Sequence, residues 1–340
     1  MPDASDKLVR DLKNFVAGEW VDSDDRIEVT NPYTNEVVGT VPKMGLDQVK
    51  KAIDFMYDYE PELTAYERSE ILRASAAEIK SRTDELAYGI SLESGMSIQD
   101  STKEVGRGVG LILTAAEEAK RIMGEQLPSD VDASGADKLI LALRHPVGLV
   151  SAIVPFNRPM NQVVVKVAPS FAAGNKTIVK PTERTPMSAI RFVEILLNNG
   201  MPPGMIGVVT GKSSEIGNEL VSSQKIDMVT FTGSTEVGRK LTNMAGIKKL
   251  TMELGGNDPL IVLDDADVKL AAKLTVAGAY GNAGQACRGV KRVLVVDSVA
   301  DEYAKEVTAL TEAIKYGDPF APGIAVGTVI DEKAAIEIED

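Results

Sequence analysis

Short apolar runs alternate with helical patterns from Val147 onward, and this alternation restricts the fold more than any other feature of the chain. The first five runs are VGLVSAIVP, KTIVKP, GMIGVVTG, DMVTFTG and KKLTMEL, with helical segments between them. Continuous apolar strands that alternate with helices are typical of a mostly parallel sheet with helices on both faces. Such sheets bind ligands at the carboxyl ends of their strands. The sequence therefore predicts an α/β fold whose functional residues follow the strands.

The remaining segments predict further parts around this sheet. Residues 14–43 hold short β-rich runs broken by Asp-Asp and Asn-Pro, which indicates an antiparallel lead-in. Helical patterns dominate from 46 to about 122, turn signals in 124–146 indicate an inserted β-hairpin, and a second strand–helix series begins at Leu254. We expect three parts, which are a discontinuous domain of residues 1–123 and 147–253, the hairpin 124–146, and a domain of residues 254–340.

Composition excludes several classes of function. The chain has 340 residues, 44% of them hydrophobic, and a net charge of −13, so we expect a large core and neither nucleic acid nor a membrane as partner. The only cysteine, Cys287, allows no intrachain disulfide and fits a reducing compartment, and the single histidine, His145, leaves no His-rich metal site. Because the start lacks a secretory pattern and no run of ~18 apolar residues occurs, we expect a cytoplasmic protein without a bound metal.

The segment GNAGQACRG, residues 281–289, surrounds the cysteine. A lone cysteine is more often a small buried hydrophobe than a nucleophile. Here small residues and glycines let the backbone approach a ligand closely, and a nearby backbone N–H can point at a developing oxyanion. Cys287 is therefore a candidate nucleophile.

Two strand ends carry candidate acid–base and hydrogen-bonding groups. Glu253 closes the run KKLTMEL, and a glycine pair follows it, so its carboxylate can act as a general base. Asn157, in PFNRP, follows the first strand and can donate an amide hydrogen to an oxyanion. The alternatives are an ordinary solvated glutamate and a turn asparagine.

Two other strand ends carry features that suit a nucleotide. FTGSTEVGRKL, residues 231–241, is a strand, a glycine-containing turn and a helix start, although it does not match G-x-G-x-x-G. Lys180 and Glu183, in KPTE, can bracket a ribose, where the carboxylate accepts from a 2′-hydroxyl and repels a 2′-phosphate. The alternative for that pair is a surface ion pair.

Taken together and in this order, PFNRP, KPTE, FTGSTEVG, ELGGNDP and NAGQAC resemble the aldehyde dehydrogenase superfamily, from about Phe15 to the end of the chain. The 34 residues from Glu253 to Cys287 also suit that family. The resemblance implies an α/β fold with a Rossmann-type parallel-sheet cofactor domain, an α/β catalytic domain and an oligomerisation hairpin. It also implies a homodimer or homotetramer. Members continue well past the position of Asp340, so we expect the C-terminal part of the catalytic domain to be missing.

The same resemblance assigns roles to individual residues. Cys287 becomes the thiolate that forms a thiohemiacetal and then a thioester, while Asn157 and the Cys287 backbone N–H form the oxyanion hole. Glu253 activates the hydrolytic water, and Lys166 lies beside the site. The expected cofactor is NAD, with NADP as the alternative, and the residues expected to hold it are Ile153, Pro155, Phe156, Lys180, Glu183, Gly233, Ser234, Gly238, Leu254 and Gly255.

Three arginines bear on the substrate. The segments PFNRPMNQ, ELGGNDPLIV and GQACRGVKR are most similar to the branch that includes lactaldehyde and phosphonoacetaldehyde dehydrogenases. Our hypothesis is that Arg107, Arg158 and Arg288 bind a small anionic aldehyde such as phosphonoacetaldehyde. The alternative is that two of the three are surface or structural arginines.

Two other functions stay open at this point. In an acylating semialdehyde dehydrogenase, coenzyme A takes the acyl group from Cys287. Glu253 favours hydrolysis instead, because acyl transfer to coenzyme A has no need of a water-activating base. A truncated nucleotide-binding paralogue without catalytic activity is the other alternative.

Overall fold

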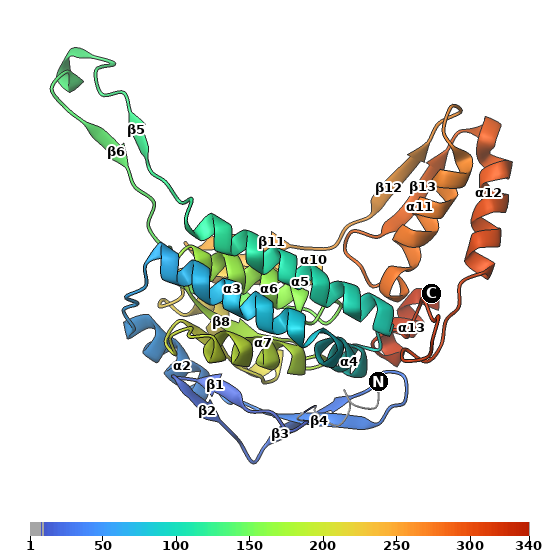
Figure 1. The fold of residues 1–340 in the computed structure, drawn as a ribbon, viewed down its shortest axis with the longest axis horizontal. Helices are drawn as coiled ribbons and strands as arrows, with labels where there is room; N and C mark the ends of the chain where they lie inside the picture. Colours follow the sequence, from blue (N-terminus) through green and yellow to red (C-terminus); the bar gives the residue numbers. More distant parts are fainter. Residues whose placement is uncertain (1–7, 9, 340) are drawn as a thin grey trace.

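The computed structural model describes residue 8 and residues 10–339, and a seven-stranded sheet forms its centre (Figure 1). Residues 1–7, 9 and 340, at the outer ends of the first and last expected domains, lie outside the described residues, as does most of the start that we searched for a secretory pattern. The sheet has the order β11-β10-β7-β8-β9-β1-β2. Its strands are β1 (Asn14–Val16), β2 (Glu19–Val21), β7 (Leu149–Ile153), β8 (Lys176–Lys180), β9 (Ile206–Val208), β10 (Met228–Thr232) and β11 (Lys249–Glu253).

Five neighbouring strands of this sheet, β11 to β9, run parallel, as the apolar runs predict. β1 and β2 add an antiparallel pair at one edge, which confirms the antiparallel lead-in. The chain builds outward from β7 through β8 to β9 and then crosses back to β10 on the other side of β7. The strand order therefore reverses between β7 and β10, where a doubly wound sheet opens a crevice for a ligand.

Helices cover both faces of the sheet because successive strand residues point to opposite faces. In β8, Ile178 packs into the core under one set of helices and Val179 into the core under the other. The face of Val179 carries α3 (Ala65–Ser81), α4 (Thr83–Ser94), α5 (Ile98–Ala119), α6 (Asn161–Ala172) and α7 (Met187–Asn198). The face of Ile178 carries α2 (Leu46–Asp58), α8 (Ser213–Ile216), α9 (Glu219–Ser222) and α10 (Thr235–Ala245).

Two antiparallel hairpins lie outside the main sheet. β3 (Arg26–Thr30) pairs with β4 (Val37–Pro42). β5 (Glu125–Leu127) pairs with β6 (Ile140–Ala142), and the 3-10 helix η1 (Ala133–Gly135) lies between them. Figure 1 shows the β5–β6 hairpin extending well away from the body of the molecule. The hairpin expected in residues 124–146 is thus confirmed.

A smaller α/β unit follows the main sheet in the chain (Figure 1). Its parallel strands are β12 (Asp258–Val262) and β13 (Val290–Val295), and its core is formed with α11 (Val268–Tyr280) and α12 (Asp297–Glu312). The 3-10 helix η2 (Gly281–Gly284) links α11 to the cysteine segment, and α13 (Glu332–Glu339) lies near the end of the chain. The expected domain boundaries at 123, 146 and 253 stay predictions.

Of the helices that the structure describes, none combines the length and the apolar character needed to cross a bilayer.

Gly148, at the entry to β7, adopts φ +126°, where side chains other than glycine are strained. A Cβ added there would lie 2.1 Å from Asp227 Oδ2, which accepts a hydrogen bond from Leu149 N at 2.8 Å. We expect Gly148→Ala to lower the free energy of unfolding by about 2 kcal/mol or more, measured by urea denaturation.

The matched control is Gly110→Ala in α5, where an added Cβ meets nothing within 4 Å. Helix propensity predicts a gain of about 0.5–1 kcal/mol for that change. Equal stabilities of the two variants would contradict the packing described at Gly148.

Candidate active site

The loops that follow β7, β10 and β11 surround a cavity of about 750 Å³ at the crevice where the strand order reverses. We call it the strand-end cavity. Six of the residues expected to hold a cofactor line it, namely Pro155, Phe156, Gly233, Ser234, Leu254 and Gly255. Cys287 and Asn157 line it as well. The structure thus brings residues from three strand ends and from the cysteine segment together.

The cysteine segment approaches the sheet through two residues in left-handed backbone conformation. Asn282 has φ 55° and ψ 42°, and Ala283 has φ 54° and ψ 34°. Asparagine tolerates this region, whereas alanine pays roughly 1–2 kcal/mol. Strain of this kind persists where the surroundings hold it, and here Asn282 Nδ2 donates to the Asn157 carbonyl oxygen at 2.8 Å.

The Asn157 side chain makes the reciprocal contact. Its Nδ2 donates to the Gln285 carbonyl oxygen at 2.9 Å, and its Oδ1 is buried without a hydrogen-bond partner. One amide hydrogen is therefore engaged, and this bond orients the other. The exposed Cys287 lies two residues beyond Gln285.

A second cavity, of about 370 Å³, shares Asn157, Thr232, Ala286 and Cys287 with the first. We call it the arginine cavity. Its lining includes all three predicted substrate-binding arginines and all four predicted catalytic residues, namely Arg107, Arg158, Arg288, Asn157, Lys166, Glu253 and Cys287. Burial, followed by the positive charges of Arg288 and Arg158, lowers the pKa of Arg107. The Arg107 guanidinium therefore lies close enough to those of Arg288 and Arg158 to be repelled by both.

Lys166 and Glu253 differ in their surroundings. Lys166 is buried in α6, and its Nζ donates to Thr230 Oγ1 at 3.0 Å. Burial lowers the pKa of Lys166 to about 8, and the negative charge of Glu253 opposes that shift. Glu253, the last residue of β11, is exposed and faces the arginine cavity.

The other expected cofactor residues lie at the same sheet edge or beneath it. Ile153 and Lys180 end β7 and β8 and pair with each other. Lys180 Nζ lies 3.4 Å from Glu183 Oε1, which also accepts from the backbone N of Ser213 at 2.6 Å and from its Oγ at 2.9 Å. Gly238, inside α10, lets Leu254 pack against the helix, because a Cβ there would lie 2.4 Å from Leu254 Cδ2.

These residues fit a dinucleotide. Ser234 is the N-cap of the eleven-residue helix α10 and accepts from Val237 N, so the positive end of the helix opens toward the strand-end cavity. Gly255 leaves space beside Thr235, since a Cβ there would come to 3.4 Å from its Oγ1. No cluster of three or more His, Cys, Asp or Glu side chains suited to a metal occurs among residues 8 and 10–339.

Sequence reasoning missed several residues of the site. The carbonyl oxygen of Gln285 accepts a hydrogen bond from Asn157, and its side-chain oxygen accepts one from Ile330 N at 2.9 Å. Ser213 donates a hydrogen bond to Glu183, and Thr230 accepts one from Lys166. Three residues of α13 line the strand-end cavity, namely Ala334, Glu337 and Ile338. Their partners are distant in the chain, and no local pattern marks any of them.

Known proteins resemble this chain over nearly its whole length. The model of the aldehyde dehydrogenase family matches residues 20–340. The NADP+-dependent succinate-semialdehyde dehydrogenase GabD of Escherichia coli is 38% identical over 96% of this chain and 68% of its own length. The 3-sulfolactaldehyde dehydrogenase of Priestia megaterium is 36% identical over 96% of this chain and 69% of its own length.

The fold of this chain also matches that of a solved aldehyde dehydrogenase structure. Betaine aldehyde dehydrogenase from Staphylococcus aureus, in complex with NAD+, superimposes with a TM-score of 0.93 at 30% identity, covering 99% of this chain and 68% of that one. The chain spans 62% of the length of the mitochondrial succinate-semialdehyde dehydrogenase of Arabidopsis thaliana, to which it is 39% identical.

Lys166 supplies a prediction about the reactivity of the cysteine. An ammonium group in the same cavity favours the thiolate, which is the form that an alkylating reagent attacks. We expect Lys166→Met to slow the reaction of Cys287 with iodoacetamide severalfold at pH 7. The difference should shrink by pH 9, because the pKa of Lys166 is about 8 and the wild-type side chain is then largely neutral.

The rate at which Cys287 gains a carbamidomethyl group, measured by mass spectrometry for the wild type and Lys166→Met over this pH range, gives the effect. Lys240→Met, at an exposed position on α10, is the control for the general loss of one positive charge. A wild-type rate for Lys166→Met at pH 7 would show that the lysine does not influence the thiol.

Proposed function

The chain belongs to the aldehyde dehydrogenase family, and we propose that it oxidises an aldehyde to its carboxylic acid with NAD(P)+ as the hydride acceptor. One observation carries the proposal, namely that Cys287 and Asn157 line both the strand-end cavity and the arginine cavity. A cofactor held in the first cavity and an aldehyde held in the second meet at the cysteine.

Covalent catalysis follows from the groups present. The Cys287 thiolate attacks the carbonyl carbon, and the resulting thiohemiacetal oxyanion accepts hydrogen bonds from the free Nδ2 hydrogen of Asn157 and from the Cys287 backbone N–H. Bound NAD(P)+ would supply the acceptor for the hydride that leaves this carbon. Glu253 then takes a proton from the water that cleaves the Cys287 thioester, which releases the acid and restores the Cys287 thiolate.

The residues proposed to hold the cofactor come from two strand ends. The α10 N-terminus with Ser234 would hold the pyrophosphate, and Lys180 and Glu183 would hold the adenosine ribose. Glu183, held by Ser213, favours NAD+ because its carboxylate repels a 2′-phosphate. NADP+ is the alternative, and it appears in the name of the GabD relative.

A small anionic aldehyde is the substrate class that the arginine cavity supports best. Arg107, Arg158 and Arg288 line it together, and a guanidinium binds carboxylate, sulfonate or phosphonate oxygens in a bidentate manner. Phosphonoacetaldehyde is one candidate of this class. The 3-sulfolactaldehyde dehydrogenase of Priestia megaterium, by its name, acts on an aldehyde that bears a sulfonate.

We further infer a homodimer or homotetramer in the cytoplasm. The β5–β6 hairpin exposes Leu139, Leu141 and Leu143 far from the body of the molecule, which suits a pairing surface (Figure 1). The reduced state of the only cysteine, which the chemistry needs, suits a reducing compartment.

Alkylation of Cys287 tests the reaction itself. Because it is the only cysteine, iodoacetamide modifies a single thiol in the chain. Complete modification, or Cys287→Ala, should lower NAD(P)H formation by a factor on the order of 10⁴ or more, the scale expected when a covalent nucleophile is removed. Binding of NAD+, measured by calorimetry, should persist in Cys287→Ala. Turnover that survives complete alkylation would refute the proposed mechanism.

Arg158→Gln tests the substrate class. For an anionic aldehyde such as phosphonoacetaldehyde, the variant should lose about 10- to 100-fold in kcat/KM, because it loses a charge-assisted contact. For propanal the loss should be small. Arg121→Gln, at an exposed position just after α5, should match the wild type with both aldehydes. If wild-type kcat/KM is equal for propanal and the anionic aldehydes, and Arg158→Gln changes neither, the substrate class is wrong.

A further inference from the structure

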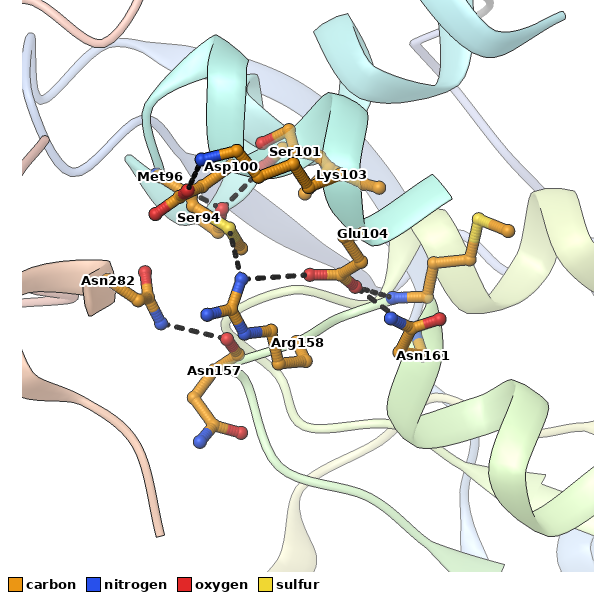
Figure 2. A network of polar contacts seen from close by, with 12 residues as sticks. Ser94, Met96, Asp100, Ser101, Lys103, Glu104, Asn157, Arg158, Asn161 and Asn282 are labelled. Carbon is orange, nitrogen blue, oxygen red and sulfur yellow. Dashed lines mark hydrogen bonds and ion pairs between the residues drawn. The ribbon is translucent and has the colours of Figure 1, made fainter. Parts of the chain in front are cut away.

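Glu104 of α5 is a buried carboxylate that the proposed reaction does not use. It is 1% exposed, and its Oε1 accepts from the backbone N–H groups of Met160 and Asn161, each at 3.0 Å. These groups lie at the start of α6, whose N-cap residue provides no side-chain hydrogen bond of its own. Glu104 therefore caps α6 from a neighbouring helix and supplies the negative charge that a helix N-terminus favours. Figure 2 shows this arrangement.

The second carboxylate oxygen of Glu104 faces Arg158. Its Oε2 is buried, has no hydrogen-bond partner and lies 3.9 Å from Arg158 Nη1. The same Nη1 lies 3.1 Å from the Met96 sulfur, which is a weak acceptor. Figure 2 shows the Arg158 guanidinium between Met96 and Glu104, with Asn157 next to it in the chain. Glu104 thus stands behind Arg158, on the side away from the solvent.

We propose that Glu104 is a positioning residue that holds Arg158 and limits the positive charge which the arginine cavity presents to an anionic aldehyde and its product. The inference rests on the proposed function and adds to it a residue that determines specificity. Glu104 uses both carboxylate oxygens. One accepts hydrogen bonds at the start of α6, and the other is the counter-charge of Arg158.

The charge of the product explains why such a limit is useful. Oxidation turns the neutral aldehyde group into a carboxylate, so the product carries one more negative charge than the substrate. A cavity with three guanidinium groups alone binds that product more tightly than the substrate and releases it slowly. The Glu104 carboxylate, on the buried side of Arg158, weakens the attraction of the cavity for the substrate and for the product. The effect is larger for the product, because it carries the higher negative charge.

The pKa of the Glu104 carboxyl group reflects the charges around it. Burial raises the pKa of Glu104 to about 7, while the hydrogen bond from Asn161, the positive charge of Arg158, the hydrogen bond from Met160 and the positive charge of Arg107 act in the opposite direction. Arg158 and Arg107 therefore both act on this buried carboxyl group.

Glu104→Gln tests the proposal, because the amide keeps one oxygen for the α6 backbone and loses the charge. Phosphonoacetate, an unreactive anion with both a phosphonate and a carboxylate, is the probe, and its Kd is measured by calorimetry on the complete chain. We expect binding about tenfold tighter in Glu104→Gln than in the wild type at pH 8, where a carboxyl group with a pKa of about 7 is mostly ionised. A residue with a merely structural role would weaken binding or leave it unchanged when replaced, and either result would overturn the proposal.

Glu93→Gln is the matched control. Glu93 of α4 is likewise buried and accepts from the backbone N–H groups of Met187 and Ser188 at the start of α7, each at 2.8 Å. It does not line the arginine cavity. The variant should therefore lose stability but keep the wild-type Kd for phosphonoacetate. Tighter binding in Glu93→Gln would overturn the assignment to Glu104.

A double-mutant cycle shows whether Glu104 acts through Arg158. In an Arg158→Gln background, Glu104→Gln should tighten binding clearly less than it does in the wild-type background, and undiminished tightening would overturn the proposed route. Should Glu104→Gln fail to fold, Arg158→Gln alone decides. It leaves a buried carboxylate without its counter-charge, so its Tm should fall by several degrees, and an unchanged Tm would refute the pairing.

The outcomes separate the two proposals. Phosphonoacetate binding needs no turnover, so a wild-type protein that binds the anion but forms no NAD(P)H refutes the proposed reaction and leaves Glu104 under test. Normal turnover with an unchanged Kd in Glu104→Gln refutes only the role of Glu104. A wild-type protein that does not bind phosphonoacetate refutes the role of Glu104 as well.

Discussion

Two reciprocal hydrogen bonds join the cysteine segment to the main sheet, and the geometry of the site depends on them. Asn157 donates from its side chain to the Gln285 carbonyl, and Asn282 donates to the Asn157 carbonyl. Asn157 follows β7 of the main sheet, whereas Asn282 and Gln285 follow α11 of the smaller unit. Because each bond spans more than 120 residues of chain, neither forms until both units have folded. Through them, two cavities meet at one thiol.

The buried charged groups near this junction lower the stability of the folded protein. Lys166 and Glu104 are buried beside the arginine cavity, and burial shifts the pKa of each toward its neutral form. Burial of a charge is unfavourable unless partners compensate it, and here the compensation is partial, since Glu104 Oε2 lacks a hydrogen bond. Ala283 adds backbone strain at the same place. Polar groups held in this manner resist reorientation, which is what an oxyanion and an anionic substrate need from a site.

The elements of the sheet could be predicted from periodicity alone. Each apolar run from VGLVSAIVP to KKLTMEL forms a parallel strand, and the hairpin in residues 124–146 and the antiparallel lead-in are present as expected. Local patterns carry this information because a strand buried on both faces must be apolar throughout. Residues that follow the strands, such as Asn157, Ser234 and Glu253, could be predicted for the same reason, since parallel strands bring their carboxyl ends to one edge.

By itself, the sequence determined which segments become strands, which helix ends and strand ends hold polar groups, and that one cysteine is available. Only the tertiary structure decided which of these groups meet. It joined Gln285 to Asn157, Ser213 to Glu183 and Glu104 to Arg158. The physical reason is that periodicity and turn signals arise from neighbours within a few residues, whereas these contacts depend on the strand order and on the packing of α5 against α6. No local pattern encodes the distance between two side chains that come together only when the whole sheet and its helices have packed.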